Sequence, residues 1–229
     1  MNWLAHAFLS CTDIDFRLGN FLADIVKGRD LHGMPPHFLS GVRCHKAIDA
    51  FTDSHPVPRR SRMRIASTWG RFSGILIDVF YDHYLAVNWD RYAGVPLPVF
   101  TASIYSALAQ RLDALPEQAR HAARIMAAED HLGAYARMEG VETALRRISH
   151  RLSMRTNRTI ALESAAASLE SNYQGIGEDF AEFFPQLQEH ASGYFILETA
   201  ANAKLHNELG ESPLTPALSA SSPWRACNL

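Results

Sequence analysis

Cysteine is scarce in this chain, and no CxxC pair is present. The cysteines, Cys11, Cys44 and Cys227, are odd in number, which argues against a disulfide framework and against a structural zinc knuckle. Their scarcity fits a reducing compartment, so we expect a cytoplasmic protein. Long apolar runs are also lacking: nowhere do about 18 uncharged apolar residues follow one another, and no basic stretch precedes the first apolar residues. We therefore expect neither a transmembrane span nor a signal peptide.

A strong excess of charge of either sign is lacking too. The formal net charge is -2 and the pI is near 6.6, which gives no global attraction to nucleic acid or to acidic membranes. We expect neither as a partner, and an anionic ligand would have to bind a local basic patch. The sequence also contains no GxSxG elbow and no GxxxxGK loop. These absences argue against covalent serine catalysis and against a P-loop nucleotide site.

Apolar residues recur at intervals of three and four, and the alternation typical of strands is scarce. With 229 residues and 47% hydrophobic content, the chain can bury one sizeable core. We predict an all-α, single-domain helical bundle over residues 1–209 and a flexible tail, rich in Ser, Pro and Ala, over residues 210–229. Residues 73–88 are so apolar and aromatic that we expect a central, buried helix there. The predicted helices cover residues 16–27, 37–52, 60–69, 73–88, 99–114, 117–128, 132–138, 138–153, 159–174 and 178–207.

Histidine and aspartate are unusually dense in the first 83 residues, at spacings that place them on common helix faces. In the HKAID segment, His45 and Asp49 are four residues apart and project from one side of a helix. In DVFYDHY, Asp78 and Asp82 repeat that spacing beside His83, in an apolar segment where unpaired carboxylates would be costly to bury. Imidazole and carboxylate together suit manganese, zinc or iron better than calcium. The candidate metal ligands are His6, Asp24, His45, Asp49, Asp78, Asp82 and His83.

Each of these features also has an ordinary structural interpretation. A His and an Asp four residues apart on a helix often form a simple hydrogen bond, and His6 alone would be a satisfied buried histidine. His6 gains weight only from the other candidates. Cys44 is adjacent to His45, but neighbouring helix residues point in different directions, so we interpret Cys44 as a packing residue.

The densest group of positive charges is the PRRSRMR segment, which follows the predicted helix that carries His45 and Asp49. Arginine side chains suit phosphate and carboxylate partners, although the same segment could be a solvated helix face. Arg43 and Lys46 flank His45 and could direct positive charge toward a metal-bound phosphate, or could point to solvent. The candidate residues for binding a phosphate or a protein partner are Arg43, Lys46, Arg59, Arg60, Arg62 and Arg64.

An ordered series of segments resembles the acyl carrier protein phosphodiesterases of bacteria, also called acyl carrier protein hydrolases. The series is MNWLAHAFLS, LGNFLADIVKG, SGVRCHKAID, FTDSHP and GILIDVFYDHYLAVNW, and it spans roughly residues 1–89. The later segment FAEFFPQLQEHA resembles the closing helix of that family. That family is distantly related to HD-domain phosphohydrolases, so the resemblance implies an HD-domain-like fold. This chain has HKAID and DH where a contiguous His-Asp pair would stand.

The resemblance implies hydrolysis of the phosphodiester between 4'-phosphopantetheine and a serine of holo acyl carrier protein, with manganese as the favoured ion. A held metal would activate water as the nucleophile. The candidate catalytic residues are Asp24, His45, Asp49 and Asp82, whose separate roles stay open. Because a carrier protein is acidic, the arginines from Arg59 to Arg64 could form its docking face.

Two other functions fit the same residues. The first is an HD-like phosphohydrolase that acts on a nucleotide or another small phosphoester with the same metal cluster in a closed pocket. The second is a helical module that binds carrier protein without catalysis. Substrate competition would separate the first from carrier-protein hydrolysis, and metal-dependent turnover would separate the second.

Overall fold

The structure is a computed structural model that describes the backbone of residues 1–209 and the side chains of residues 1–194. Within residues 1–209 the chain forms α-helices joined by short 3-10 turns, and no strand occurs there. The predicted all-α class is therefore confirmed. The predicted tail, residues 210–229, lies outside the described residues.

The helices follow one another through short connections. Their bounds are α1 Trp3–Phe8, α2 Ile14–Leu22, α3 Pro36–Ser54, α4 Pro56–Trp69, α5 Ser73–Val87, α6 Trp89–Tyr92, α7 Leu97–Arg111, α8 Glu117–Ala128, α9 Met138–Thr156, α10 Ala166–Ser171 and α11 Tyr173–Leu209. The 3-10 turns are η1 Gly28–Leu31, η2 Gly70–Phe72, η3 Leu112–Ala114, η4 Gly133–Ala136 and η5 Glu163–Ala165. None of the helices in the described part of the chain is both long enough and apolar enough to cross a membrane.

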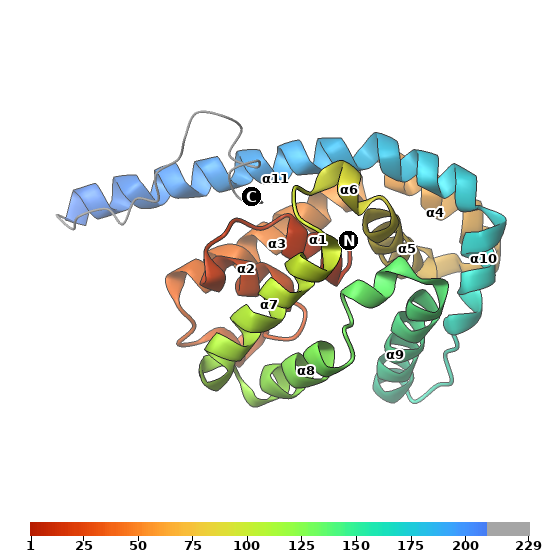
Figure 1. The fold of residues 1–229 in the computed structure, drawn as a ribbon, viewed down its shortest axis with the longest axis horizontal. Coiled ribbons are helices and arrows are strands. Elements are labelled where there is room, and N and C mark those ends of the chain that lie inside the picture. The colour runs from red at the N-terminus through yellow and green to blue at the C-terminus, as the bar shows by residue number, and fades with distance from the viewer. Residues whose placement is uncertain (210–229) are drawn as a thin grey trace.

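Helix α5 is the centre of the core, as its apolar composition predicts. Its side chains from Leu76 to Ala86 are buried except at Asp78, and α1, α4, α9 and α11 all pack against it. Helix α11 runs along one edge of the molecule, past α4, α5 and α3 (Figure 1). It presents Phe180, Phe183 and Phe184 to the core, so the aromatic residues of one long helix join helices from the first half of the chain.

Helices α2 and α3 approach each other more closely than ordinary side chains allow. A Cβ atom at Gly19 would overlap the backbone oxygen of Phe38, and a Cβ atom at Gly41 would overlap that of Phe16. Both positions therefore need glycine, because any larger residue would push the helices apart. The close contact also fixes Asn20 on α2 beside His45 on α3.

Replacing Gly19 by alanine is expected to lower the thermal midpoint of unfolding. The added methyl group must displace backbone, and overpacking of this kind costs about 2 to 3 kcal/mol, or about 5 to 10 °C for a chain of this size. Gly193→Ala is the matched control, because no atom lies within 4 Å of a Cβ atom there. That helical position should gain about 0.5 kcal/mol. Equal midpoints for the two variants, measured by circular dichroism, would contradict the close packing.

Several predicted helices need correction. Helix α1 was not predicted, and its short span is explained by capping from outside: Asp82 on α5 accepts from the backbone N–H groups of Leu4 and Ala5. The helix predicted over residues 132–138 is the 3-10 turn η4. The helix predicted over residues 16–27 corresponds to α2, which ends earlier, at Leu22. Helix α4 begins at Pro56, earlier than predicted, because proline is well tolerated in a first turn.

The predicted helix over 159–174 is broken into η5 and α10, after an irregular stretch. Serines of α9 supply the reason, because they accept hydrogen bonds that helix carbonyls would otherwise take. Ser153 Oγ accepts from the N–H of Ile160 at 2.9 Å, and Ser149 Oγ accepts from that of Leu162 at 2.7 Å. The next helix, α11, begins at Tyr173 and continues through Pro185.

Candidate metal centre

Three of the candidate ligands meet at one point between α1 and α3. His6 on α1 and His45 on α3 stack with ring centroids 3.8 Å apart, and Asp49 follows His45 by one helical turn. His6 Nε2 lies 3.2 Å from Asp49 Oδ1, and His45 Nε2 lies 3.1 Å from Asp49 Oδ2. Their ligand atoms all lie within 4.8 Å of one another. This group is called the His-His-Asp cluster below.

Asn20 determines which nitrogen of each ring carries a hydrogen atom. His6 Nδ1 lies 2.9 Å from Asn20 Oδ1, and His45 Nδ1 lies 2.8 Å from the backbone oxygen of Asn20. The amide of Asn20 is itself oriented, because its Nδ2 donates to Ser10 Oγ at 2.9 Å. Since both partners of the rings are acceptor oxygens, each Nδ1 must donate. In the neutral rings, each Nε2 then carries a lone pair facing Asp49.

This arrangement fits a divalent cation. Two nitrogen lone pairs that face a carboxylate repel it when no cation lies between them. The buried His6 Nε2 also makes no well-formed hydrogen bond within the described residues, although Asp49 lies beside it. A cation ligated by all three groups would satisfy them. Atoms that share one ion at about 2.1 Å lie about 3 to 3.5 Å apart, which matches the 3.2 and 3.1 Å between the two Nε2 atoms and the Asp49 oxygens.

The charge states of the cluster suit the same ion. Burial and the neighbouring His45 lower the pKa of His6, so the ring is neutral and its Nε2 is available as a ligand. For Asp49, burial favours the neutral acid, but in the metal-free protein hydrogen bonds from His45 and His6, made when a ring also carries a proton on Nε2, and the charge of the Met1 ammonium outweigh burial and hold the pKa below its ordinary value. With 41% of its side chain exposed, Asp49 also opens the cluster to solvent.

Two further candidate carboxylates lie at the rim of the cluster. Asp24 Oδ2 is 4.0 Å from His45 Nε2, while Asp24 Oδ1 accepts from Lys27 at 2.9 Å. Asp78 Oδ1 lies 3.0 Å from the amino group of Met1, which is also 3.6 Å from Asp49. Burial lowers the pKa of that amino group, but Asp78 and Asp49 outweigh burial and raise it to about 10. The rim therefore combines exposed carboxylates with one buried ammonium.

Asp82 and His83 are not among the three residues whose ligand atoms come together. Asp82 is fully buried and binds the amino-terminal end of α1, and burial raises its pKa to about 7 against the effect of those backbone hydrogen bonds. His83 Nδ1 lies 2.8 Å from the backbone oxygen of Tyr135, and its Nε2 lies 3.0 Å from the hydroxyl of Tyr173. In this structure Asp82 therefore positions the helix that carries His6.

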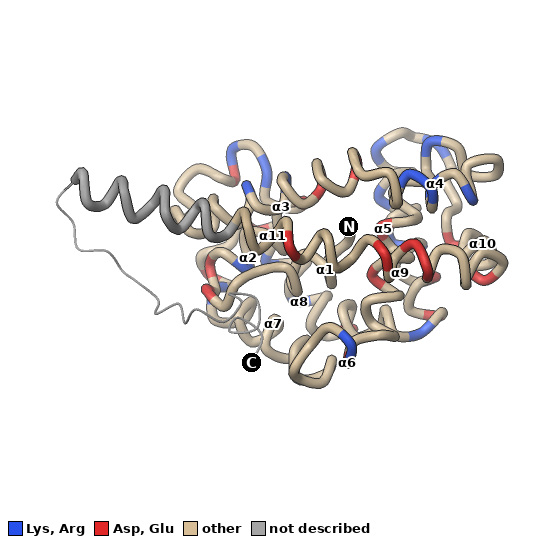
Figure 2. Tube along the Cα trace, turned by 90° about the horizontal axis from the view of Figure 1, so that it is seen from above, with Lys and Arg blue, Asp and Glu red and all other residues tan. Residues whose placement is uncertain are grey.

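The candidate arginines gather around α4 (Figure 2), and most of them have partners. Arg60 and Arg64 both contact Asp179, at 2.6 and 2.9 Å, and Arg62 contacts Asp53 at 2.9 Å. Arg59 is exposed, and its side chain makes no ion pair or hydrogen bond with another described residue. On α3, Lys46 is exposed and Arg43 donates to Ser40 at 2.8 Å.

Asn20 was not among the candidate residues, although it orients both histidines. Its signal in the sequence is a single polar residue within the otherwise apolar run from Leu18 to Leu22, and in the structure it is fully buried. Burying an amide without a hydrogen-bond partner is costly, so such a position points to a specific partner. That partner lies on another helix, which the sequence does not show.

Replacing Asn20 by alanine is expected to weaken manganese binding by about 10- to 100-fold, because the rings lose the group that fixes their tautomer and orientation. Titration calorimetry of the metal-free protein measures this change. Ser10→Ala is the control, since it removes the hydrogen bonds of Ser10 Oγ with the Asn20 amide and the His6 backbone oxygen but keeps the contacts of Asn20 with both rings. A folded Asn20→Ala protein with unchanged manganese affinity would remove Asn20 from the metal centre.

Comparison with known proteins gave a consistent result. The family described as acyl carrier protein phosphodiesterase matches residues 1–187. Curated relatives named acyl carrier protein phosphodiesterase include one from Pectobacterium atrosepticum, which is 29% identical over 192 residues, covering 83% of this chain and 97% of the relative. The relative from Serratia proteamaculans is 30% identical with the same coverage, and one from Escherichia coli O6:H1 is 28% identical over 84% of this chain and 98% of its own. No significant match to a solved structure was found.

Proposed function

The chain belongs to the acyl carrier protein phosphodiesterase family, and from this membership we propose that it hydrolyses the phosphodiester joining 4'-phosphopantetheine to a serine of holo acyl carrier protein. The observation that carries the proposal is the His-His-Asp cluster, in which two oriented imidazoles and a carboxylate face one point. The products are apo carrier protein and free 4'-phosphopantetheine. Manganese is the proposed ion.

In the proposed mechanism, His6, His45 and Asp49 hold the cation, and Asn20 keeps both rings in the ligand form. When bound, the cation supplies a Lewis acid that makes water acidic and polarises the phosphoryl oxygens. Asp24 is exposed beside His45, so it is placed to orient the attacking water and to accept its proton. Water would form the new bond to phosphorus as the bond to the serine oxygen breaks, and the proton that Asp24 took from the water would pass to that oxygen.

The rim of the cluster suits a protein-bound substrate. Asp24, Asp49 and Asp78 keep 56, 41 and 34% of their side chains exposed, so a phosphodiester can reach the cluster from outside. An exposed site favours a substrate displayed on a folded partner over one that must be enclosed. This accessibility supports carrier protein over a small phosphoester as the substrate.

The deciding experiment is incubation of the purified protein with manganese and holo acyl carrier protein, followed by intact mass measurement with and without chelator. We expect loss of the 4'-phosphopantetheine mass only when metal is present. Unchanged carrier mass under verified metal loading would contradict the proposed substrate. Turnover of small phosphoesters in the same protein would then favour an HD-like phosphohydrolase, and absence of all turnover would favour a binding module.

We propose that the basic surface of α4 binds the acidic carrier protein. Arg59 is the clearest test because its guanidinium has no partner within the described residues, whereas Arg60 and Arg64 are already paired with Asp179. A surface hollow of about 520 Å³ lies beside it, lined also by Ser54, Pro56 and the exposed Met63. Exposed apolar surface among cations is suited to a helix with acidic and apolar side chains.

Arg59→Glu is expected to raise the KM for holo acyl carrier protein about threefold to tenfold at low salt, with little change in kcat, because it reverses one charge at the docking surface. Steady-state kinetics at two ionic strengths measure this, and added salt should reduce the effect. Arg124→Glu, an exposed change on α8, is the control. The same KM for both variants at low salt would remove the α4 surface from carrier recognition.

A further inference from the structure

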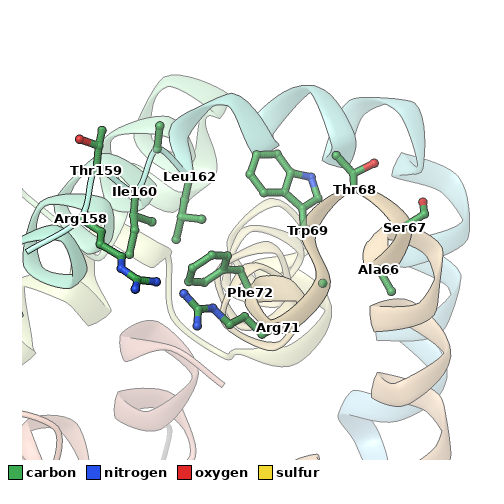
Figure 3. A pocket seen from close by; sticks show the side chains of 12 residues that line it. Ala66, Ser67, Thr68, Trp69, Arg71, Phe72, Arg158, Thr159, Ile160 and Leu162 are labelled. Atoms are coloured by element: carbon green, nitrogen blue, oxygen red, sulfur yellow. The ribbon is translucent and has the colours of Figure 1, made fainter. Parts of the chain in front are cut away.

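A second cavity lies at the opposite end of α4 from Pro56. Its volume is about 580 Å³, and it is bounded by the carboxy-terminal end of α4, by η2 and by the segment that follows α9 (Figure 3). Gly70 has a φ of 49°, a conformation that suits glycine, and the chain turns there to bring Trp69 and Phe72 to one wall. The opposite wall begins just after Asn157, where α9 ends in a left-handed residue.

Two arginines from distant parts of the chain face this cavity. Figure 3 shows the guanidinium groups of Arg71 and Arg158 pointing into the same space beside the ring of Phe72. Both residues are exposed, and neither makes an ion pair or a hydrogen bond with another residue that the structure describes. Like charges that converge without a carboxylate between them repel each other, and a bound anion would remove that repulsion.

Part of the remaining cavity wall is apolar, beside the polar side chains of Ser67, Thr68 and Thr159. The indole nitrogen of Trp69 donates to Ser168 Oγ at 2.8 Å, so the ring is fixed against α10. Arg71 lies over the Phe72 ring, with its guanidinium carbon 4.9 Å from the centroid. Ile160 and Leu162 complete the apolar surface. A pocket of this size that combines a rigid apolar wall with a few convergent polar groups is typical of small-molecule sites.

We propose that this cavity binds a phosphate monoester of a small organic molecule. The phosphate would lie between the forked guanidinium groups of Arg71 and Arg158, each of which can donate two parallel hydrogen bonds to it. The organic part would lie against Trp69 and Phe72. None of the residues that line the cavity belongs to the His-His-Asp cluster, so the site is independent of the proposed hydrolysis.

Binding is tested by titration calorimetry and tryptophan fluorescence on the full-length protein in chelator, with inorganic phosphate, phenyl phosphate and benzoate as probes. Phenyl phosphate should bind at least about tenfold more tightly than inorganic phosphate, because its ring buries apolar area against the wall. It should also bind at least about tenfold more tightly than benzoate, which has one charge and fewer acceptors.

Arg71→Ala and Arg158→Ala should each weaken phenyl phosphate binding by at least about tenfold, and Arg71→Lys should weaken it less because the charge remains. Arg155→Ala, an exposed change on α9 outside the cavity, is the matched control and should leave binding unchanged. Circular dichroism checks that the variants are folded. Equal affinities for the wild type and both cavity variants, or binding that requires manganese, would overturn the proposal.

Discussion

Asp49→Ala is expected to abolish manganese binding and to lower turnover of holo acyl carrier protein by about a thousandfold or more. Asp49 is the anionic member of the His-His-Asp cluster, and without it only two imidazole side chains, which carry no negative charge, remain to hold a divalent cation. Losing the Lewis acid removes several kcal/mol of transition-state stabilisation, and about 4 kcal/mol corresponds to that factor. Elemental analysis of the dialysed protein and intact mass kinetics measure the two effects separately.

Asp53→Ala is the matched control, because Asp53 is one turn further along α3 and pairs with Arg62 outside the cluster. It should keep both manganese and turnover. Asp49 is partly exposed, so its loss should leave the fold intact, and circular dichroism would show this. An Asp49→Ala protein that retains metal and turnover would exclude the cluster as the catalytic centre.

The acid stability of the metal-free protein gives an independent view of the same residue. The folded pKa of Asp49 lies below the ordinary value of about 3.9, so its ionised form stabilises the fold above that pH. The contribution is lost as the pH falls through the lowered pKa. Stability attributable to Asp49 should therefore be present at neutral pH and absent in strong acid.

The half of the cluster on α3 could be predicted from sequence because it is local. His45 and Asp49 are four residues apart, and helical geometry alone puts them on one face. His6 lies on a different helix, so it was a candidate only because of the other histidines and aspartates nearby in the sequence, and no spacing could place it beside His45. The dependence of both rings on Asn20 could not be predicted, because it needs the contact between α2 and α3 that Gly19 and Gly41 permit.

Dependence on contacts from other helices also explains why α1 and the segment after α9 were predicted wrongly. Helix α1 is too short to be stable by itself and depends on Asp82, which is 77 and 78 residues away from the groups it caps. The segment after α9 is rich enough in apolar residues to suggest a helix, yet serines of α9 bind its backbone. In each case a side chain from another helix supplies hydrogen bonds that local propensity does not include.

Asp179 links three helices through contacts that no pattern of spacing would predict. It is 1% exposed on α11 and binds Arg60 and Arg64 of α4, and it also accepts from Ser61 Oγ at 2.8 Å. Ser61 in turn lies 2.9 Å from the hydroxyl of Tyr81 on α5. For Asp179, burial raises the pKa, but hydrogen bonds from Arg64, Ser61 and Arg60 outweigh burial and lower it overall.

Asp179→Ala is therefore expected to destabilise the protein by about 3 kcal/mol, which lowers the thermal midpoint by about 6 to 12 °C, because it leaves Ser61 and two arginines without their buried acceptor. Glu182→Ala is the matched control: it removes a half-exposed partner of Arg60 and should cost less than about 1 kcal/mol.

Because the folded pKa of Asp179 is lowered, its contribution to stability is present above about pH 4 and lost as the pH falls. The difference between wild type and Asp179→Asn, measured by urea unfolding, should accordingly shrink in acid. A difference that stays constant down to about pH 2 would show that the carboxylate charge does not hold α11 against α4.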